Sequence, residues 1–147
     1  MKALYFLIIT VLSLPCGAAA IDHRIECPLE IPMKAISITA APAGWTPFLP
    51  FEYRNGMQLT SAGMMWGPPS SMSMAKPSFT GKVHGKNTER WDAPGTAADE
   101  KWMACYYGKD GYPDAIMSQR LPDSATQCVV TYPREKSDKR LDIMCKW

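Results

Sequence analysis

Thirteen prolines and ten glycines are spread along the 147-residue chain, and they limit the helices that it can form. Proline removes a backbone donor and disrupts the interior of a helix. No long apolar stripe with the helical period lies between these residues. The apolar runs are instead short and separated by turn residues, which is typical of antiparallel strands. The sequence therefore predicts a mainly antiparallel all-β domain, a small sandwich or barrel with at most one or two short helical turns.

The N-terminal residues have the composition of an export signal. Lys2 supplies a positive charge, and an almost unbroken apolar run follows from Ala3 to Leu14. This run is shorter than the roughly 20 residues of a membrane-spanning helix. The residues before Cys16 lack the pattern of a lipidated cysteine. We expect a cleaved signal peptide over residues 1–20 and a single periplasmic β domain over residues 21–147.

Four cysteines remain after the expected cleavage, namely Cys27, Cys105, Cys128 and Cys145. An even number of cysteines in a small exported domain indicates two disulfides, and three pairings are possible. We favour Cys27 with Cys145, which would tie the N-terminal segment to the last strand. Cys105 with Cys128 would then link two neighbouring strands. No Cys-x-x-Cys pair and no Cys/His cluster with zinc spacing is present.

The charge balance and the motifs exclude several classes of function. Sixteen Lys and Arg face 14 Asp and Glu, so the nearly neutral chain offers no electrostatic case for nucleic acid. No later apolar run is long enough for membrane insertion. The two histidines beyond the leader, His23 and His84, are far apart, and no nucleophile elbow or phosphate-binding glycine motif appears. We expect no enzyme, no cofactor and no small-molecule substrate.

Alternation and turn residues predict the positions of the strands. Asn55-Gly56 has the composition of a two-residue hairpin turn. The segment 114–121 is ambiguous between a strand and a short helix, and 96–99 resembles a capping box that would start one helical turn. The expected strands are 34–40, 51–54, 57–60, 78–86, 101–107, 126–132 and 140–147.

The stretch 61–77 is rich in Gly, Pro, Ser and Met, and we expect it to be a long surface loop. Methionine side chains adapt to irregular surfaces, and tryptophan is frequent at binding hot spots. This loop, extended by Trp91, is the predicted partner-binding surface. Its candidate contact residues are Met64, Met65, Trp66, Pro68, Met72, Met74, Lys76 and Trp91.

Copper binding is the alternative function for the same loop. Thioether sulfur is a soft ligand that suits Cu(I), and an extracytoplasmic compartment is where such a site is useful. The candidate ligands for this alternative site are Met64, Met65, Met72, Met74 and His84.

Several features follow one another along the chain: Cys27-Pro28, Gly44-Trp45-Thr46, the strand 101–108 (KWMACYYG), Arg120-Leu121-Pro122 and Cys128. Their order resembles a family of small exported proteobacterial proteins, some of which are encoded in type VI secretion clusters beside toxins that attack the cell envelope. The Met-rich loop is not among these features.

The resemblance implies a periplasmic immunity protein that binds and occludes a cognate antibacterial effector. The expected effector is a peptidoglycan-targeting enzyme, because its substrate lies in the same compartment. An inhibitor of the lysozyme type is a related alternative. The resemblance assigns no catalytic or binding residue.

Overall fold

The computed structural model describes residues 19–37, 42–44, 46, 56–93, 100–109, 113–135 and 138–147. These residues form nine strands: β1 (Asp22–Ile25), β2 (Glu30–Ile31), β3 (Met57–Trp66), β4 (Phe79–Val83), β5 (Lys86–Asp92), β6 (Lys101–Tyr107), β7 (Ala115–Arg120), β8 (Gln127–Thr131) and β9 (Asp142–Lys146). Two 3-10 turns, η1 (Met33–Ala35) and η3 (Pro69–Ser71), are the helical elements of this part of the chain. None of its helices is long and apolar enough to span a bilayer.

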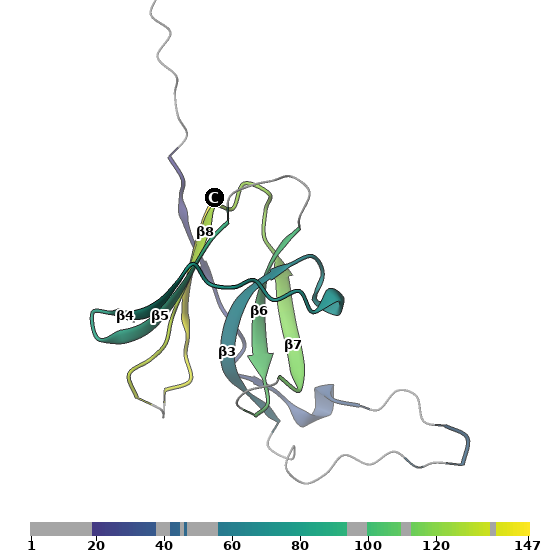
Figure 1. Cartoon of the computed structure of the whole chain (residues 1–147). Coiled ribbons are helices and arrows are strands. Elements are labelled where there is room, and N and C mark those ends of the chain that lie inside the picture. Colours follow the sequence, from purple (N-terminus) through teal and green to yellow (C-terminus); the bar gives the residue numbers. More distant parts are fainter. Residues whose placement is uncertain are drawn as a thin grey trace, which may run out of the picture.

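The strands form two antiparallel sheets that pack as a sandwich, as the sequence predicts (Figure 1). The five-stranded sheet has the order β1-β9-β8-β5-β4, and the four-stranded sheet has the order β2-β3-β6-β7. In Figure 1 the β4–β5 hairpin extends to the left, away from β3, β6 and β7. One edge of the larger sheet therefore projects from the body of the sandwich.

Alternating apolar residues of both sheets fill the core. The strand β6 directs Met103, Cys105 and Tyr107 inward, and all three are buried. From the opposite sheet, Val130 and Ile143 are fully buried at register partners on β8 and β9. Burying one side chain of this size stabilises a fold by roughly 1.5–3 kcal/mol, so alternation fixes which face of each strand turns inward.

A β-bulge in β3 decides which residues of that strand are buried. The register with β6 shifts between Leu59 and Ser61, and the hydroxyl of the extra residue, Thr60, donates a hydrogen bond to the Tyr106 carbonyl at 3.0 Å. Before the bulge, Leu59 packs in the core, and beyond it Met64 does so instead. One inserted residue thus changes the inward positions from odd to even numbers.

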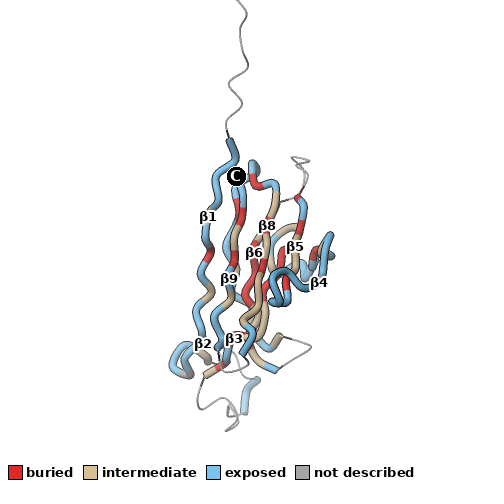
Figure 2. Tube along the Cα trace, turned by 90° about the vertical axis from the view of Figure 1, so that its left-hand side faces the viewer, coloured by how far each residue is buried: buried red, intermediate tan, exposed pale blue. Residues whose placement is uncertain are grey.

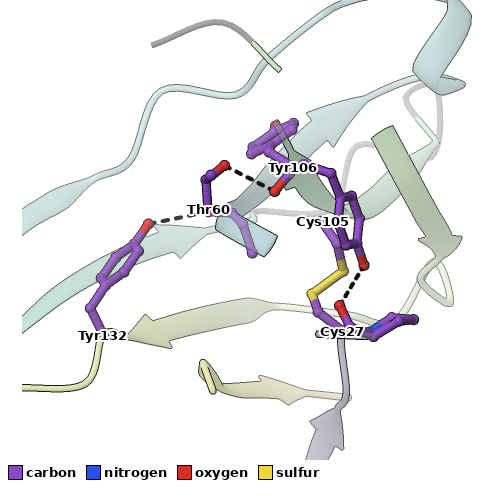
Figure 3. The surroundings of a disulfide bond; sticks show 8 residues. Cys27, Thr60, Cys105, Tyr106 and Tyr132 are labelled. Carbon is purple, nitrogen blue, oxygen red and sulfur yellow. Dashed lines mark hydrogen bonds between the residues drawn. A yellow bond between two sulfur atoms is a disulfide. The ribbon is translucent and has the colours of Figure 1, made fainter. Parts of the chain in front are cut away.

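The disulfides are Cys27–Cys105 and Cys128–Cys145, so the expected pairing of Cys27 with Cys145 and of Cys105 with Cys128 is wrong. Cys105 and Cys128 lie on β6 and β8, which belong to different sheets. Cys128 instead lies directly opposite Cys145 on neighbouring strands, with their Cα atoms 4.1 Å apart. Cys27 follows β1 and crosses to β6 of the other sheet (Figure 3).

Some of the predicted strands are present in the structure and others are not. Those over 101–107, 126–132 and 140–147 are confirmed as β6, β8 and β9, and the ambiguous segment 114–121 contains β7. The strand expected over 34–40 is wrong in its first half, where η1 lies, and its end falls outside the described residues.

The expected strand 78–86 is instead the first half of a hairpin. It turns at His84 and Gly85, which both have positive φ, 49° and 75°, as a two-residue turn of this kind requires. Of the hairpin predicted around Asn55-Gly56, residues 51–55 lie outside the described part, and so do 96–99.

Candidate contact surface

The predicted loop 61–77 is wrong over its first half, because residues 61–66 belong to β3. Met64 and Met65 are both 0% exposed, and Trp91, on β5, is 4% exposed. These three side chains are buried and do not belong to the exposed surface of the structure. The misinterpretation has a physical cause: Gly63 and the two methionines lack the β-branching that marks a strand, and pairing with β6 overrides this weak local preference.

The next residues continue the sheet rather than leave it. Met74 forms an isolated antiparallel bridge with Met65. The Trp66 amide donates to the Ser73 carbonyl, and the Ala75 amide donates to the Met64 carbonyl, each at 2.9 Å. The segment 73–75 therefore covers the edge of β3 beyond β2, and it presents a fixed backbone.

Trp91, on β5 of the five-stranded sheet, forms a hydrogen bond with the segment 73–75. Its indole Nε1 donates a hydrogen bond to the Ala75 carbonyl at 2.9 Å. A Cβ atom at Gly63 would lie 3.4 Å from the Trp91 ring and 3.4 Å from the Tyr106 ring. Both rings therefore pack directly against the backbone of Gly63.

Four of the predicted contact residues are exposed, namely Pro68, Met72, Met74 and Lys76. Trp66 is half-buried and packs against the core. Met72 and Met74 are 54% and 50% exposed, which is high for large apolar side chains. The surface half of the prediction is thus compatible with the structure, but its contact with a partner stays a prediction.

Two further exposed apolar residues follow on β4. Phe79 is 36% exposed and Val83 is 41% exposed. We call Met72, Met74, Phe79 and Val83 the apolar stretch, because they follow one another along 72–83. The sequence shows Phe79 and Val83 as the apolar residues of a strand, but it does not show that this strand lies at an edge and outside the core.

The ring of Phe79 is held in place by its neighbours. The guanidinium carbon of Arg90 lies 5.6 Å from the ring centroid, within the range of a cation–π contact. Phe79 and Arg90 are directly opposite in the β4–β5 register. A Cβ atom at Gly81 would lie 2.8 Å from the Phe79 ring, so the ring lies over that glycine.

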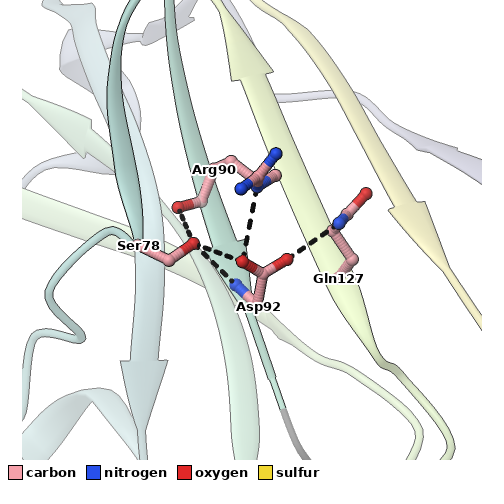
Figure 4. Close-up of polar contacts among 4 residues, drawn as sticks. All are labelled: Ser78, Arg90, Asp92 and Gln127. Carbon is pink, nitrogen blue, oxygen red and sulfur yellow. Dashed lines mark hydrogen bonds and ion pairs between the residues drawn. The ribbon is translucent and has the colours of Figure 1, made fainter.

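A polar network fixes the start of β4 to the larger sheet (Figure 4). The Ser78 hydroxyl lies 2.7 Å from one carboxylate oxygen of Asp92, and the Gln127 amide donates to the other at 2.8 Å. These hydrogen bonds, first that of Ser78 and then that of Gln127, lower the pKa of Asp92 below its usual value. Asp92 thus connects the entry to β4 with β5 and β8.

The structure brings together only part of the proposed copper ligands, since Met65 and Met74 lie opposite each other in an isolated antiparallel bridge. Successive residues of a strand point to opposite faces, and of the two adjacent methionines only Met64 belongs to the core cluster between the sheets. His84 lies in the β4–β5 turn. Within the described ranges, no group of three or more His, Cys, Asp or Glu side chains could hold a metal ion.

A cleft of about 740 Å³ opens beside β1 and the segment after β8. Basic and acidic side chains line it in equal number, and Arg24 and Asp142 form a 2.9 Å ion pair. This balance gives the cleft no net charge with which to select a charged ligand.

A protein-family model, described as the type VI secretion system Tli immunity protein, matches residues 53–146. The chain belongs to the Tli immunity family. No curated protein and no solved structure gives a match. The family agrees with the predicted resemblance to proteins of type VI secretion clusters, although Cys27 and Gly44-Trp45-Thr46 precede the matched range.

Membership decides the class of function. A Tli immunity protein acts by binding a cognate type VI effector and is not an enzyme. The matched range contains every strand from β3 to β9, and it includes the whole apolar stretch. The surface that this Tli protein exposes at 72–83 therefore belongs to the part shared with its family.

Proposed function

We propose that this Tli protein protects its own cell by binding a Tle lipase effector in the periplasm and covering the entrance to its active site. The family match over residues 53–146 is the observation that carries this proposal. Tli proteins neutralise Tle lipase effectors rather than peptidoglycan enzymes, so the expectation of a peptidoglycan-targeting partner is wrong for this family.

The chemistry of the exposed surface supports a lipase as the partner. A lipase must admit acyl chains, so the entrance to its active site is lined by apolar groups. The apolar stretch offers two methionines and two further apolar side chains to such an entrance, each more than a third exposed. Methionine adapts to irregular apolar surfaces. No feature of the described residues favours the copper or the lysozyme-inhibitor alternative in the same way.

The disulfides support action outside the cytosol. Such bonds persist in oxidising compartments, and a leader over residues 1–20 would deliver the chain there. The structure describes only the last two residues of that leader. Disulfides also reduce the ordering that binding requires, because Cys27–Cys105 links the two sheets before any partner arrives.

A cell-protection experiment tests the proposal. The cognate Tle lipase is directed to the periplasm of a host, together with either the full chain or a chain that lacks residues 1–20. We expect the full chain to restore growth and the leaderless chain to fail. Growth that both forms leave unrestored, while the lipase is active, would overturn the proposal.

A further inference from the structure

The strand β4 forms the outer edge of the five-stranded sheet. Four of its five residues are exposed, and Gly81 is the exception. Figure 2 shows β4 exposed on the far side from β1. No described residue pairs with the outer edge of this strand. Unpaired edges are templates for another strand, and proteins usually shorten or cover them.

The hairpin geometry identifies which backbone groups are free. Val83 and Lys86 flank the two-residue turn, and such flanking residues form a hydrogen-bonded pair. Hydrogen-bonded and non-hydrogen-bonded pairs alternate along an antiparallel ladder. The amides and carbonyls of Thr80 and Lys82 therefore point away from β5, toward solvent. An added strand would bind these groups.

The outer half of the hairpin is basic. Lys82 and Lys86 are exposed on either side of the turn. The Arg134 guanidinium joins them by donating to the His84 carbonyl at 2.6 Å. No Asp or Glu occurs between residues 79 and 88. An extended segment with carboxylate side chains would therefore complement this edge.

We propose that β4 receives an extended, acidic segment of the effector as an additional strand of the five-stranded sheet. This inference rests on the proposed function and assigns it a binding mode. Backbone hydrogen bonds to Thr80 and Lys82 would supply affinity. Phe79 and Val83 would pack against alternate apolar side chains of the segment, and Lys82 and Lys86 would select its carboxylates.

A second copy of this chain fits the same edge less well. Pairing two β4 strands would bring two basic hairpins together, and the like charges of Lys82 and Lys86 would repel their counterparts. These lysines would attract an acidic segment but repel a second copy of the hairpin. The charge pattern therefore favours the effector as the partner.

The test uses Thr80→Pro, with Thr80→Ala as its matched control. Proline is tolerated at an edge strand where the amide faces solvent, so the variant should fold. It removes an outward donor, whereas alanine keeps that donor. We expect Thr80→Pro to weaken binding of the cognate lipase by about tenfold or more and Thr80→Ala to leave it nearly unchanged.

Two further measurements do not depend on the proline. Lys82→Glu should weaken binding, with Lys82→Gln intermediate between it and the wild type. Amide exchange at Thr80 and Lys82 of the wild-type chain should slow when the lipase is added. Unchanged exchange, or full affinity of Thr80→Pro and Lys82→Glu, would overturn the inference while leaving the proposed function intact.

Sedimentation separates the remaining outcomes. A wild-type dimer that Thr80→Pro converts to a monomer would assign the edge to a second copy and overturn the inference. Failure of the wild-type chain to bind the lipase would overturn the proposed function itself, and this inference with it.

Discussion

The indole of Trp91 donates a hydrogen bond to the carbonyl of Ala75 at 2.9 Å. Trp91 lies in the core on β5, whereas Ala75 lies between the exposed Met74 and Lys76. A core residue of one sheet thus fixes the backbone of the segment that we propose to face the effector. Rigidity at this point lowers the cost of ordering the segment on binding.

Trp91→Phe should therefore lower both stability and affinity. The substitution leaves the buried Ala75 carbonyl without its partner, and an unsatisfied buried group costs about 1–3 kcal/mol. Urea unfolding measures the loss, and binding of the lipase should weaken in parallel. Trp102→Phe is the matched control, since its half-buried indole donates only to the exposed side chain of Glu100. Equal effects of the two substitutions would contradict this role for Trp91.

Met72→Lys combined with Met74→Lys should abolish inhibition of the lipase without unfolding the chain. Both side chains are at least half exposed, so the fold loses little, while the contact with an apolar entrance is lost. Lipase inhibition and thermal unfolding are the two measurements. Met117→Lys serves as control, because Met117 is 44% exposed on β7, outside the apolar stretch. Full inhibition by the double variant would exclude these methionines from the interface.

Met64→Ala should lower the stability of the fold without weakening the binding of the lipase. Met64 is fully buried, and truncating a buried methionine to alanine costs about 2–5 kcal/mol through lost burial and the cavity that remains. Urea unfolding should detect this loss, while the variant that is still folded should bind the lipase with nearly wild-type affinity. A stable variant with impaired binding would mean that Met64 reaches the surface.

The two disulfides should differ in their contribution to stability. Cys27–Cys105 joins residues 78 positions apart, and Cys128–Cys145 joins residues 17 positions apart. Loop-closure entropy predicts stabilisation of about 4.5 kcal/mol for the longer loop and about 3 kcal/mol for the shorter loop. Urea unfolding of the two Cys→Ser pair variants compares them. A larger loss from the shorter loop would contradict the entropic argument.

Alkaline pH should destabilise the fold through Tyr107. Burial raises its pKa from 10.0 to about 12, and its hydroxyl donates to the Pro28 carbonyl at 2.8 Å. Between pH 10 and about 12, the phenol is still neutral in the folded state, whereas it is already ionised in the unfolded chain. Its stabilising contribution is therefore complete below pH 10 and is lost as the pH rises toward 12. Urea unfolding should show that the free energy of unfolding falls less steeply with pH in Tyr107→Phe than in the wild type. The same pH dependence in both proteins would contradict this role for Tyr107.

The sequence predicts the parts of the fold that depend on local pattern. The run from Lys101 to Tyr107 is apolar at every position after Lys101, and a short run of this kind is typical of a central, buried strand such as β6. The all-β class follows from the spacing of proline and glycine. In these regions the local preference and the tertiary structure agree.

The parts that depend on long-range pairing could not be predicted. Which cysteines join depends on which strands become neighbours, and Cys105 and Cys128 have no local signal that places them in different sheets. The burial of Met64 and Met65 depends on a bulge at Thr60 and on pairing with β6. The exposure of Phe79 follows from the edge position of β4, which only the order of strands reveals.

The most direct measurement is a titration of the cognate Tle lipase with the purified, oxidised chain from residue 21 onward. The account predicts that ester hydrolysis falls to zero near one equivalent, and that Met72→Lys with Met74→Lys leaves hydrolysis intact. Undiminished hydrolysis in the presence of excess wild-type chain would contradict the claim that this surface blocks a lipase.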